Sequence, residues 1–316
     1  MAKLTLADFR RQFESVLDPS DRVVVVYSGI WTFGHRFGMD LKTLPLALVE
    51  TMLEAVGPDR TLLLPAYTYA YSRTRRFSPG KTPPETGVLP QTVFARLQWV
   101  RTRSAFNSFF AIGPQAAELA AIRGETIWGE GGLKAHLDHA DARMVVLGVP
   151  WKDACGFLHR IEEVCRVPWR YFKTFPGIWE GEHGDEPWTE SIYVHSRTLM
   201  PECRWELPDA QLRKRGGVRT GSGEILIESA SAADLIVAGR EILADDPYRL
   251  VVNAADVRRW VEHDKQCEID DMRRADPREA AYLDALAGAS PSETASETAR
   301  EPARETAPAA EPAARS

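Results

Sequence analysis

His159 and Glu162 are the two residues of this chain whose types and spacing best suit proton transfer. They follow Arg143–Val149, an apolar run typical of a buried strand, and a loop that contains Gly156. If the chain is helical from Gly156, residues three apart lie on one face, so the Glu162 carboxylate could hold the imidazole. A histidine held in this way suits the role of a general base near neutral pH. Taken alone, the segment instead favours a hydrogen-bonded core histidine beside a glutamate on a solvated face.

The elements that must position this pair form an α/β pattern. Apolar runs predict buried strands, and a 3.6-residue apolar period predicts helices. The expected strands cover 22–27, 61–64 and 143–149, and the expected helices cover 5–17, 41–56, 87–98, 231–244 and 255–264. Shorter strands and hairpin signals begin at Ile192. We therefore expect an α/β fold with a central, mostly parallel sheet flanked by helices, and a smaller mixed or antiparallel C-terminal part.

The composition indicates a globular protein without a membrane span. Hydrophobic residues make up 44% of the 316 residues and charged residues 27%, and no apolar run reaches the length of about 18 residues expected of a spanning helix. The net charge of −6 argues against nucleic acid as the main partner. None of the four cysteines forms a CxxC pair, so we expect no metal. The first residues lack the apolar core of a signal peptide, and we expect a cytoplasmic protein.

Three segments of different character follow one another along the chain. We expect a single α/β domain over residues 1–264 and a helical extension over 265–287. Residues 288–316 contain no aromatic residue and repeat Ala, Glu, Thr, Pro and Arg, so they cannot bury a core. This last segment is predicted to be a disordered tail.

Two loops could contact a ligand. Ser28–Gly38 follows the first strand, and its glycines and hydroxyls could let backbone N–H groups meet an anion, or the loop could be a plain connection. Alternating Tyr67, Tyr69 and Tyr71 follow the second strand. Tyrosines suit the faces of sugars or nucleotides and could line a cleft, although an edge strand explains the pattern equally well.

Several motifs in order resemble one family, the aminoglycoside 3-N-acetyltransferase-type N-acyltransferases, which use acyl-CoA. The resemblance covers roughly residues 20 to 250. The motifs that carry it are Val26-Tyr27-Ser28, Leu63-Leu64-Pro65-Ala66-Tyr67-Thr68-Tyr69, Arg103-Ser104…Ser108…Gly113, and Leu147-Gly148-Val149 followed by Leu158-His159-Arg160-Ile161-Glu162.

The resemblance implies a co-substrate, an acceptor and a mechanism. It implies direct acyl transfer from acetyl-CoA or another acyl-CoA to a small-molecule amine, with His159 as general base and Glu162 orienting its ring. A homodimer is an open option. The implied contacts to the acyl-CoA are Ser28, Gly29, Ile30, Trp31, Phe33, Gly34 and Ser108. The implied contacts to the acceptor are Tyr67, Tyr69, Arg170, Tyr171 and Lys173.

Some of these roles have alternatives. Cys155 could be an acyl-enzyme nucleophile instead of a packing residue. Ser28, Ser108 or backbone N–H groups could stabilise the oxyanion. Arg170 and Lys173 could meet a diphosphate or lie at a solvated helix end.

Residues 157–175 resemble most the branch that acylates amino groups of nucleotide-linked sugars. Phe106-Asn107 stands where the resistance enzymes usually carry His-Pro, and glycines occupy positions 132 and 156 where a hydroxyl residue is expected. We therefore expect transfer to an amino sugar that is nucleotide-linked. The alternatives are acetylation of an aminoglycoside or another small antibiotic-like amine, and a non-catalytic CoA- or ligand-binding module.

Overall fold

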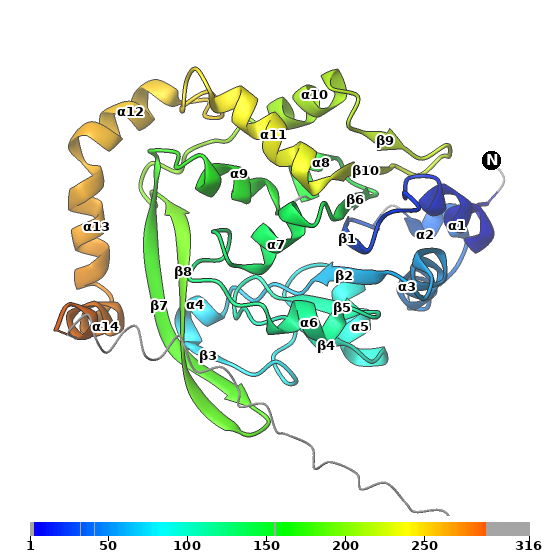
Figure 1. The fold of residues 1–316 in the computed structure, drawn as a ribbon, viewed down its shortest axis with the longest axis horizontal. Helices are drawn as coiled ribbons and strands as arrows, with labels where there is room; N and C mark the ends of the chain where they lie inside the picture. The colour runs from blue at the N-terminus through cyan, green and yellow to red at the C-terminus, as the bar shows by residue number, and fades with distance from the viewer. Residues whose placement is uncertain (1–2, 32, 41, 155, 289–316) are drawn as a thin grey trace, which may run out of the picture.

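A seven-stranded sheet runs through the centre of the molecule (Figure 1). The computed structural model describes residues 3–31, 33–40, 42–154 and 156–288. The strand order is β4-β5-β2-β1-β6-β10-β9. The bounds are β1 Val23–Ser28, β2 Thr61–Pro65, β4 Val100–Arg101, β5 Phe109–Ile112, β6 Arg143–Leu147, β9 Arg219–Thr220 and β10 Ile227–Ser231. Strands β1, β2 and β6 pair in parallel, and only β5 and β10 run against the direction of the rest of this sheet. The expected mostly parallel sheet is confirmed.

Helices cover both faces of this sheet because its strands are apolar on both sides. Val23 and Val25 of β1 belong to one core, and Val24 and Val26 belong to the other, as the two-residue period of a strand requires. The first core also receives residues of α6 (Ala116–Ala121), α7 (Leu133–His139), α9 (Leu158–Val164), α10 (Glu206–Lys214) and α11 (Ala232–Leu243). The second receives residues of α1 (Leu6–Glu14), α2 (Phe33–Phe37), α3 (Leu44–Val56) and α5 (Val88–Arg96). The two short helices α4 (Tyr71–Thr74) and α8 (Trp151–Ala154) lie in loops.

The helices predicted from periodicity are present, and their ends have local causes. Helix α1 begins after Thr5, whose hydroxyl accepts a hydrogen bond from the Asp8 backbone while the Asp8 carboxylate accepts one from the Thr5 backbone. Helix α3 ends at Gly57, whose φ of 75° is a conformation that favours glycine. The predicted boundaries are a few residues too generous, because terminal turns lack the hydrogen bonds that define a helix.

A second, three-stranded sheet is built mainly from a long hairpin. Strand β7 (Arg170–Gly181) pairs antiparallel with β8 (Gly184–His195), and β3 (Arg76–Phe77) pairs parallel with β7. The expected smaller mixed sheet therefore exists, but it comes from the middle of the chain and not from the C-terminal part. A helical setting for Arg170 and Lys173 is also wrong. Helix α9 ends before Arg166, whose φ of 49° is left-handed, and the chain then turns into β7.

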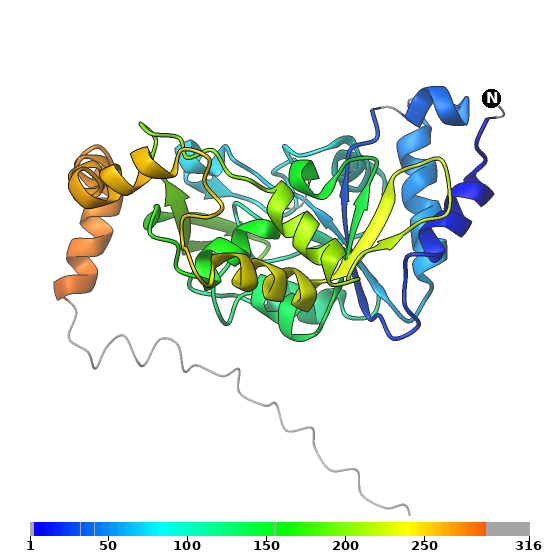
Figure 2. The ribbon, with the colours of Figure 1, turned by 90° about the horizontal axis from the view of Figure 1, so that it is seen from above.

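Three C-terminal helices lie along the outer side of the hairpin (Figures 1 and 2). They are α12 (Ala254–His263), α13 (Lys265–Arg274) and α14 (Pro277–Gly288). Helix α14 is fastened to β7 because Glu279 accepts a hydrogen bond from the Thr174 backbone at 2.7 Å and pairs with Lys173. The division at residues 264 and 287 stays a prediction, and 289–316 lie outside the described residues. Within the described chain, no helix is long and apolar enough to span a membrane.

Candidate active site

A cavity of about 690 Å³ lies at the carboxyl ends of the three parallel strands. Ser28 ends β1, Pro65 ends β2 and Val149 follows β6, and all three line it. The end of β8 forms part of another wall. The carboxyl edge of a parallel sheet is where α/β proteins place their ligands, and the volume suits a small molecule.

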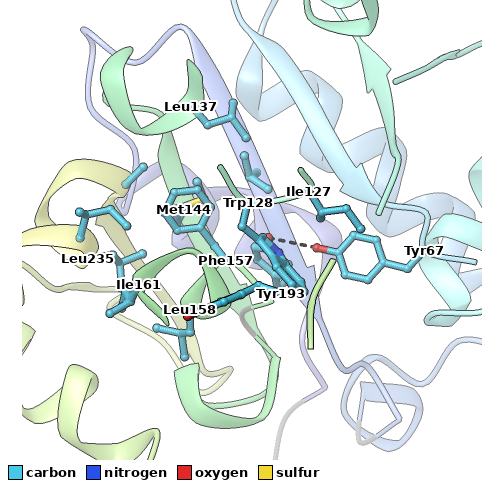
Figure 3. Packing of buried hydrophobic residues seen from close by; sticks show 14 of the residues in the cluster. Tyr67, Ile127, Trp128, Leu137, Met144, Phe157, Leu158, Ile161, Tyr193 and Leu235 are labelled. Carbon is cyan, nitrogen blue, oxygen red and sulfur yellow. Dashed lines mark hydrogen bonds between the residues drawn. The ribbon is translucent and has the colours of Figure 1, made fainter. Parts of the chain in front are cut away.

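Aromatic side chains make up much of the lining. They are Tyr27, Trp31, Tyr67, Tyr69, Phe106, Trp128 and Tyr193. Figure 3 draws three of them, Tyr67, Trp128 and Tyr193, with a dashed line at the Tyr67 hydroxyl. The hydroxyls of Tyr27 and Tyr67 lie 3.4 Å apart. The cavity thus combines aromatic faces with a few polar groups, as ligand sites commonly do.

His159 enters this cavity from α9 with Glu162 behind it. The imidazole Nδ1 lies 2.7 Å from Glu162 Oε2, and Glu162 is fully buried. Arg170 Nη2 also lies 3.2 Å from Nδ1, but the contact with the ionised Glu162 is shorter, and a carboxylate only accepts. We therefore assign the proton to Nδ1, which leaves a lone pair on Nε2. The rings of Trp128 and Trp205 lie 5.3 Å from the imidazole and hold its orientation. This is the arrangement of an oriented general base.

Arg170 completes the charge balance of the pair. Its Nη2 lies 2.7 Å from Glu162 Oε2, and its Nη1 donates to the Tyr193 carbonyl at 2.8 Å. Trp169 Nε1 donates to the other Glu162 oxygen at 3.3 Å. Burial raises the pKa of Glu162, but the Arg170 charge and the hydrogen bond from His159 outweigh it and bring the pKa down to about 2. Glu162 is therefore ionised at neutral pH.

The same surroundings keep His159 neutral. Burial lowers its pKa below the ordinary 6.5, and the positive charges of Arg170 and Lys134 lower it further. The Glu162 carboxylate opposes these effects but does not overcome them. At pH 7 the imidazole can consequently accept a proton, which a charged imidazolium could not do.

Comparison with known families decides where the chain belongs. A family model described as aminoglycoside 3-N-acetyltransferase matches residues 35–244, about two thirds of the chain. The chain belongs to the aminoglycoside 3-N-acetyltransferase family. This assignment confirms the predicted class of enzyme, an acyl-CoA-dependent N-acyltransferase. A curated relative is aminoglycoside N(3)-acetyltransferase IV of Salmonella sp, 26% identical over 206 residues that cover 64% of this chain and 75% of the relative.

Solved structures of the acetyltransferase family share the fold. AAC-IIIb in a binary complex with CoASH superimposes with a TM-score of 0.65 at 19% identity, covering 77% of this chain and 97% of that one. Sisomicin-bound AAC-VIa superimposes with a TM-score of 0.63 at 21% identity, covering 77% and 99%. At these identities the likeness extends to the fold, which confirms the predicted α/β architecture.

The acyl-CoA contacts expected from the acetyltransferase resemblance divide into two groups. Ser28 and Trp31 line the cavity, and Trp31 is 74% exposed at its edge. Among the other loop residues, Gly29, Ile30, Phe33 and Gly34 lie outside the lining. Ile30 and Phe33 instead belong to the second core. Gly29 allows the fold of the loop, since a Cβ there would lie 2.3 Å from both the Trp31 ring and Val149.

Ser108 does not reach the cavity. It is fully buried, its hydroxyl donates to the Ala66 carbonyl at 2.8 Å, and it accepts from Arg101 Nε at 2.9 Å. Its proton is therefore bound by the Ala66 carbonyl, and the expected role as acyl-CoA contact or oxyanion donor stays a prediction without support from this placement. Ser108 belongs to a buried hydrogen-bond network around Arg101, whose guanidinium also donates to the carbonyl of Ala66 and to the hydroxyl of Thr68.

Of the acceptor contacts expected from sequence, some line the cavity and others do not. Tyr67, Tyr69 and Arg170 line the cavity. Tyr171 and Lys173 do not, because alternate residues of β7 point to opposite faces and these two face the C-terminal helices. The expectation that they touch the acceptor stays a prediction, and this placement gives it no support. The edge-strand alternative for Tyr67 is wrong, since this residue lies in a loop between β2 and α4. Its place in the lining agrees with the cleft alternative.

Several lining residues were missed from the sequence. They are Asn107, Trp128, Tyr193, His195 and Arg197, together with Asp153. Tyr193 and His195 could have been found from the hairpin, because Gly181 and Gly184 flank a two-residue turn between its strands. Cys155, the alternative nucleophile, lies outside the described residues. No group of His, Cys, Asp or Glu in the described ranges could hold a metal ion, and the expectation of no metal stays a prediction.

Proposed function

We propose that this protein transfers an acetyl or other acyl group from acyl-CoA to an amine of an amino sugar, with His159 as general base. The observation that carries the proposal is the His159–Glu162–Arg170 set, which presents a neutral imidazole to a cavity of ligand size. Membership of the acetyltransferase family supplies the reaction class.

The proposed reaction is direct acyl transfer, without an acyl-enzyme intermediate. The amine loses a proton to His159 Nε2 as its nitrogen forms a bond to the thioester carbonyl carbon. Collapse of the tetrahedral intermediate breaks the C–S bond, and the departing CoA thiolate takes the proton from the imidazolium. Glu162 stabilises that imidazolium while it exists. Such proton transfer contributes roughly 10²–10⁴ to the rate.

Ser28 and Trp31 would meet the acyl-CoA at the edge of the cavity. AAC-IIIb, which shares this fold, was solved with CoASH bound, and this supports acetyl-CoA as the co-substrate. The exposed Trp31 ring offers a face for the co-substrate, and the Ser28 hydroxyl offers a donor.

The charges around the cavity favour an anionic acceptor, such as a nucleotide-linked amino sugar. Asp153 is the one carboxylic acid among the described lining residues, and it already accepts from Lys152 at 2.7 Å. Arg197 contributes positive charge, whereas the charge of Arg170 is balanced by the ionised Glu162. Aminoglycosides are polycations and would need several carboxylates for complementary binding. An aminoglycoside acceptor remains the second candidate because AAC-VIa, of the same fold, was solved with sisomicin.

Thiol release from acetyl-CoA in the presence of an amine panel tests the proposal. The panel holds nucleotide-linked amino sugars, aminoglycosides and simple amines. We expect turnover with the first group and a fall of roughly 10²–10⁴ in His159→Ala. His139→Ala is the matched control, because His139 is exposed on α7 away from the cavity. Equal turnover in His159→Ala and the parent would refute the base assignment, and tight acetyl-CoA binding without turnover would indicate a binding module.

A further inference from the structure

A buried lysine stands directly behind the cavity wall. Lys134 of α7 is only 2% exposed. Its Nζ lies 5.4 Å from the ring centroids of both Tyr67 and Trp128, two residues of the cavity lining, and 5.7 Å from that of Phe109. A cation among three aromatic rings is attracted to their faces and is shielded from bulk water. A positive charge is thus fixed behind the part of the wall that Tyr67 and Trp128 form.

The Lys134 ammonium sets the orientation of the Asn107 side chain. Its Nζ lies 2.8 Å from Asn107 Oδ1. An ammonium can only donate, so the amide oxygen must face it and the amide nitrogen must face elsewhere. The turn that carries Asn107 is fixed as well, because its backbone N–H donates to Ser104 Oγ at 2.8 Å. The side-chain amide is therefore held with one known end toward the lysine.

The other end of this amide is available to a ligand. Asn107 is a lining residue of the cavity that also holds His159. Within the described residues, Asn107 Nδ2 forms no hydrogen bond, and it is not among the buried polar atoms that lack a partner, so it is open to the cavity. It can therefore donate two N–H groups. Ser108, the residue next to it, cannot serve as a donor because its proton is bound by the Ala66 carbonyl.

We propose that Asn107 Nδ2 donates a hydrogen bond to the thioester carbonyl oxygen of the acyl-CoA, and that Lys134 is the positioning residue that holds this amide. The proposal rests on the proposed acyl transfer. When the amine attacks, the carbonyl π electrons move onto that oxygen, and they return when the C–S bond breaks. A fixed donor backed by a shielded positive charge stabilises the oxygen most while it is anionic. Loss of one such donor costs roughly 10²–10³ in kcat.

Asn107→Asp and Asn107→Ala test the donor. The aspartate keeps the shape and still accepts from Lys134, but it offers no N–H group and adds negative charge. We expect kcat to fall by roughly 10²–10³ in both variants, with the KM for acetyl-CoA within about threefold of the parent. Turnover within about threefold of the parent in both folded variants would overturn the proposal.

Lys134→Met tests the positioning role, with Lys214→Met as its matched control on an exposed position of α10. We expect kcat to fall in Lys134→Met alone. We also expect the midpoint of its pH–kcat profile to rise, because the Lys134 charge lowers the pKa of His159. Asp153, Arg170, His195 and Arg197 line the same cavity, Glu162 contacts His159 from behind, and all five are unchanged in both variants. An unmoved midpoint together with an unchanged kcat would refute the role of Lys134.

A spectroscopic readout separates this proposal from the proposed function. Infrared difference spectra of bound acetyl-CoA, labelled with ¹³C at the carbonyl, report hydrogen bonding to that oxygen without any amine. We expect a lowered carbonyl stretch in the parent and in His159→Ala, and its return toward the free value in Asn107→Ala. A lowered stretch with no acetylation of any amine supports the donor while the proposed function fails. A stretch unchanged between the parent and Asn107→Ala, or no binding of acetyl-CoA, overturns the proposal.

Discussion

Replacement of Glu162 by glutamine should damage both stability and catalysis. Glu162 has a pKa of about 2 in the folded protein against an ordinary value of 4.5, and each unit of difference corresponds to about 1.4 kcal/mol. The ionised carboxylate thus contributes about 3 kcal/mol at neutral pH. The cost of breaking a buried ion pair leads to a similar figure, about 3–5 kcal/mol, because Arg170 is only 5% exposed and would keep an unpaired charge.

The kcat of Glu162→Gln should fall for a reason separate from the loss of stability. The glutamine amide can donate to Nδ1 of His159, which stabilises the tautomer whose Nε2 carries the proton. The lone pair would then face away from the substrate. The corresponding carboxylate-to-amide change in catalytic triads costs roughly 10⁴ in kcat. We expect a fall of the same order in Glu162→Gln.

Urea unfolding and steady-state kinetics together test these expectations. A group with a depressed folded pKa stabilises the protein above its unfolded pKa, and this stability is lost as the pH falls toward the folded value. The stability gap between parent and Glu162→Gln should therefore be full at pH 7 and shrink between about pH 5 and pH 2. The half-exposed Glu186, paired with Arg103, provides the control: Glu186→Gln should change stability by less than about 1 kcal/mol. Equal unfolding midpoints and equal kcat for parent and Glu162→Gln would refute this reasoning.

Three further predictions concern the same site. The kcat measured at saturating substrates should rise with pH through an inflection below 6.5 and stay level near pH 7, because burial lowers the pKa of His159; an inflection above 7 would contradict this. Ser108→Ala should lower the free energy of unfolding by roughly 1–3 kcal/mol, since Arg101 Nε loses its acceptor, and should leave the KM for acetyl-CoA within about twofold; a large rise in that KM would restore Ser108 as a contact. Trp31→Ala should raise the KM for acetyl-CoA about 3- to 10-fold with an unchanged melting temperature, because this ring is 74% exposed; an unchanged KM would remove it from the co-substrate site.

The parts of the fold that could be predicted from sequence are those with strong local signals. The valine run of β1 and the leucine run of β2 are apolar on both faces, so only a central strand can bury them. The β7–β8 hairpin has glycines at its turn, but its strands contain no comparable apolar run. Its strands alternate only in part between buried and half-exposed residues, and β7 contains Pro176 and Gly177. Its stability comes from packing against helices distant in sequence, which no local pattern records.

The candidate site shows the same division. His159 and Glu162 are three residues apart, so helix geometry alone brings them together. The Arg170 partner was expected elsewhere, because its approach depends on where α9 ends and β7 begins. The contact between Lys134 and Asn107 joins two segments 27 residues apart. Such a contact follows from the tertiary fold and has no signature in residue spacing.

The hairpin strand β7 also limits which insertions and deletions this protein can tolerate. Arg170 contacts Glu162 on one face of the strand, and Lys173 binds Glu279 of α14 on the other. A change of one residue near the start of β7 would exchange the two faces, so that both ion pairs would be lost together. A change of two residues would preserve the faces and shift only the register. We therefore expect variants with two residues inserted or deleted at this point to fold, and variants with one residue inserted or deleted to lose both ion pairs.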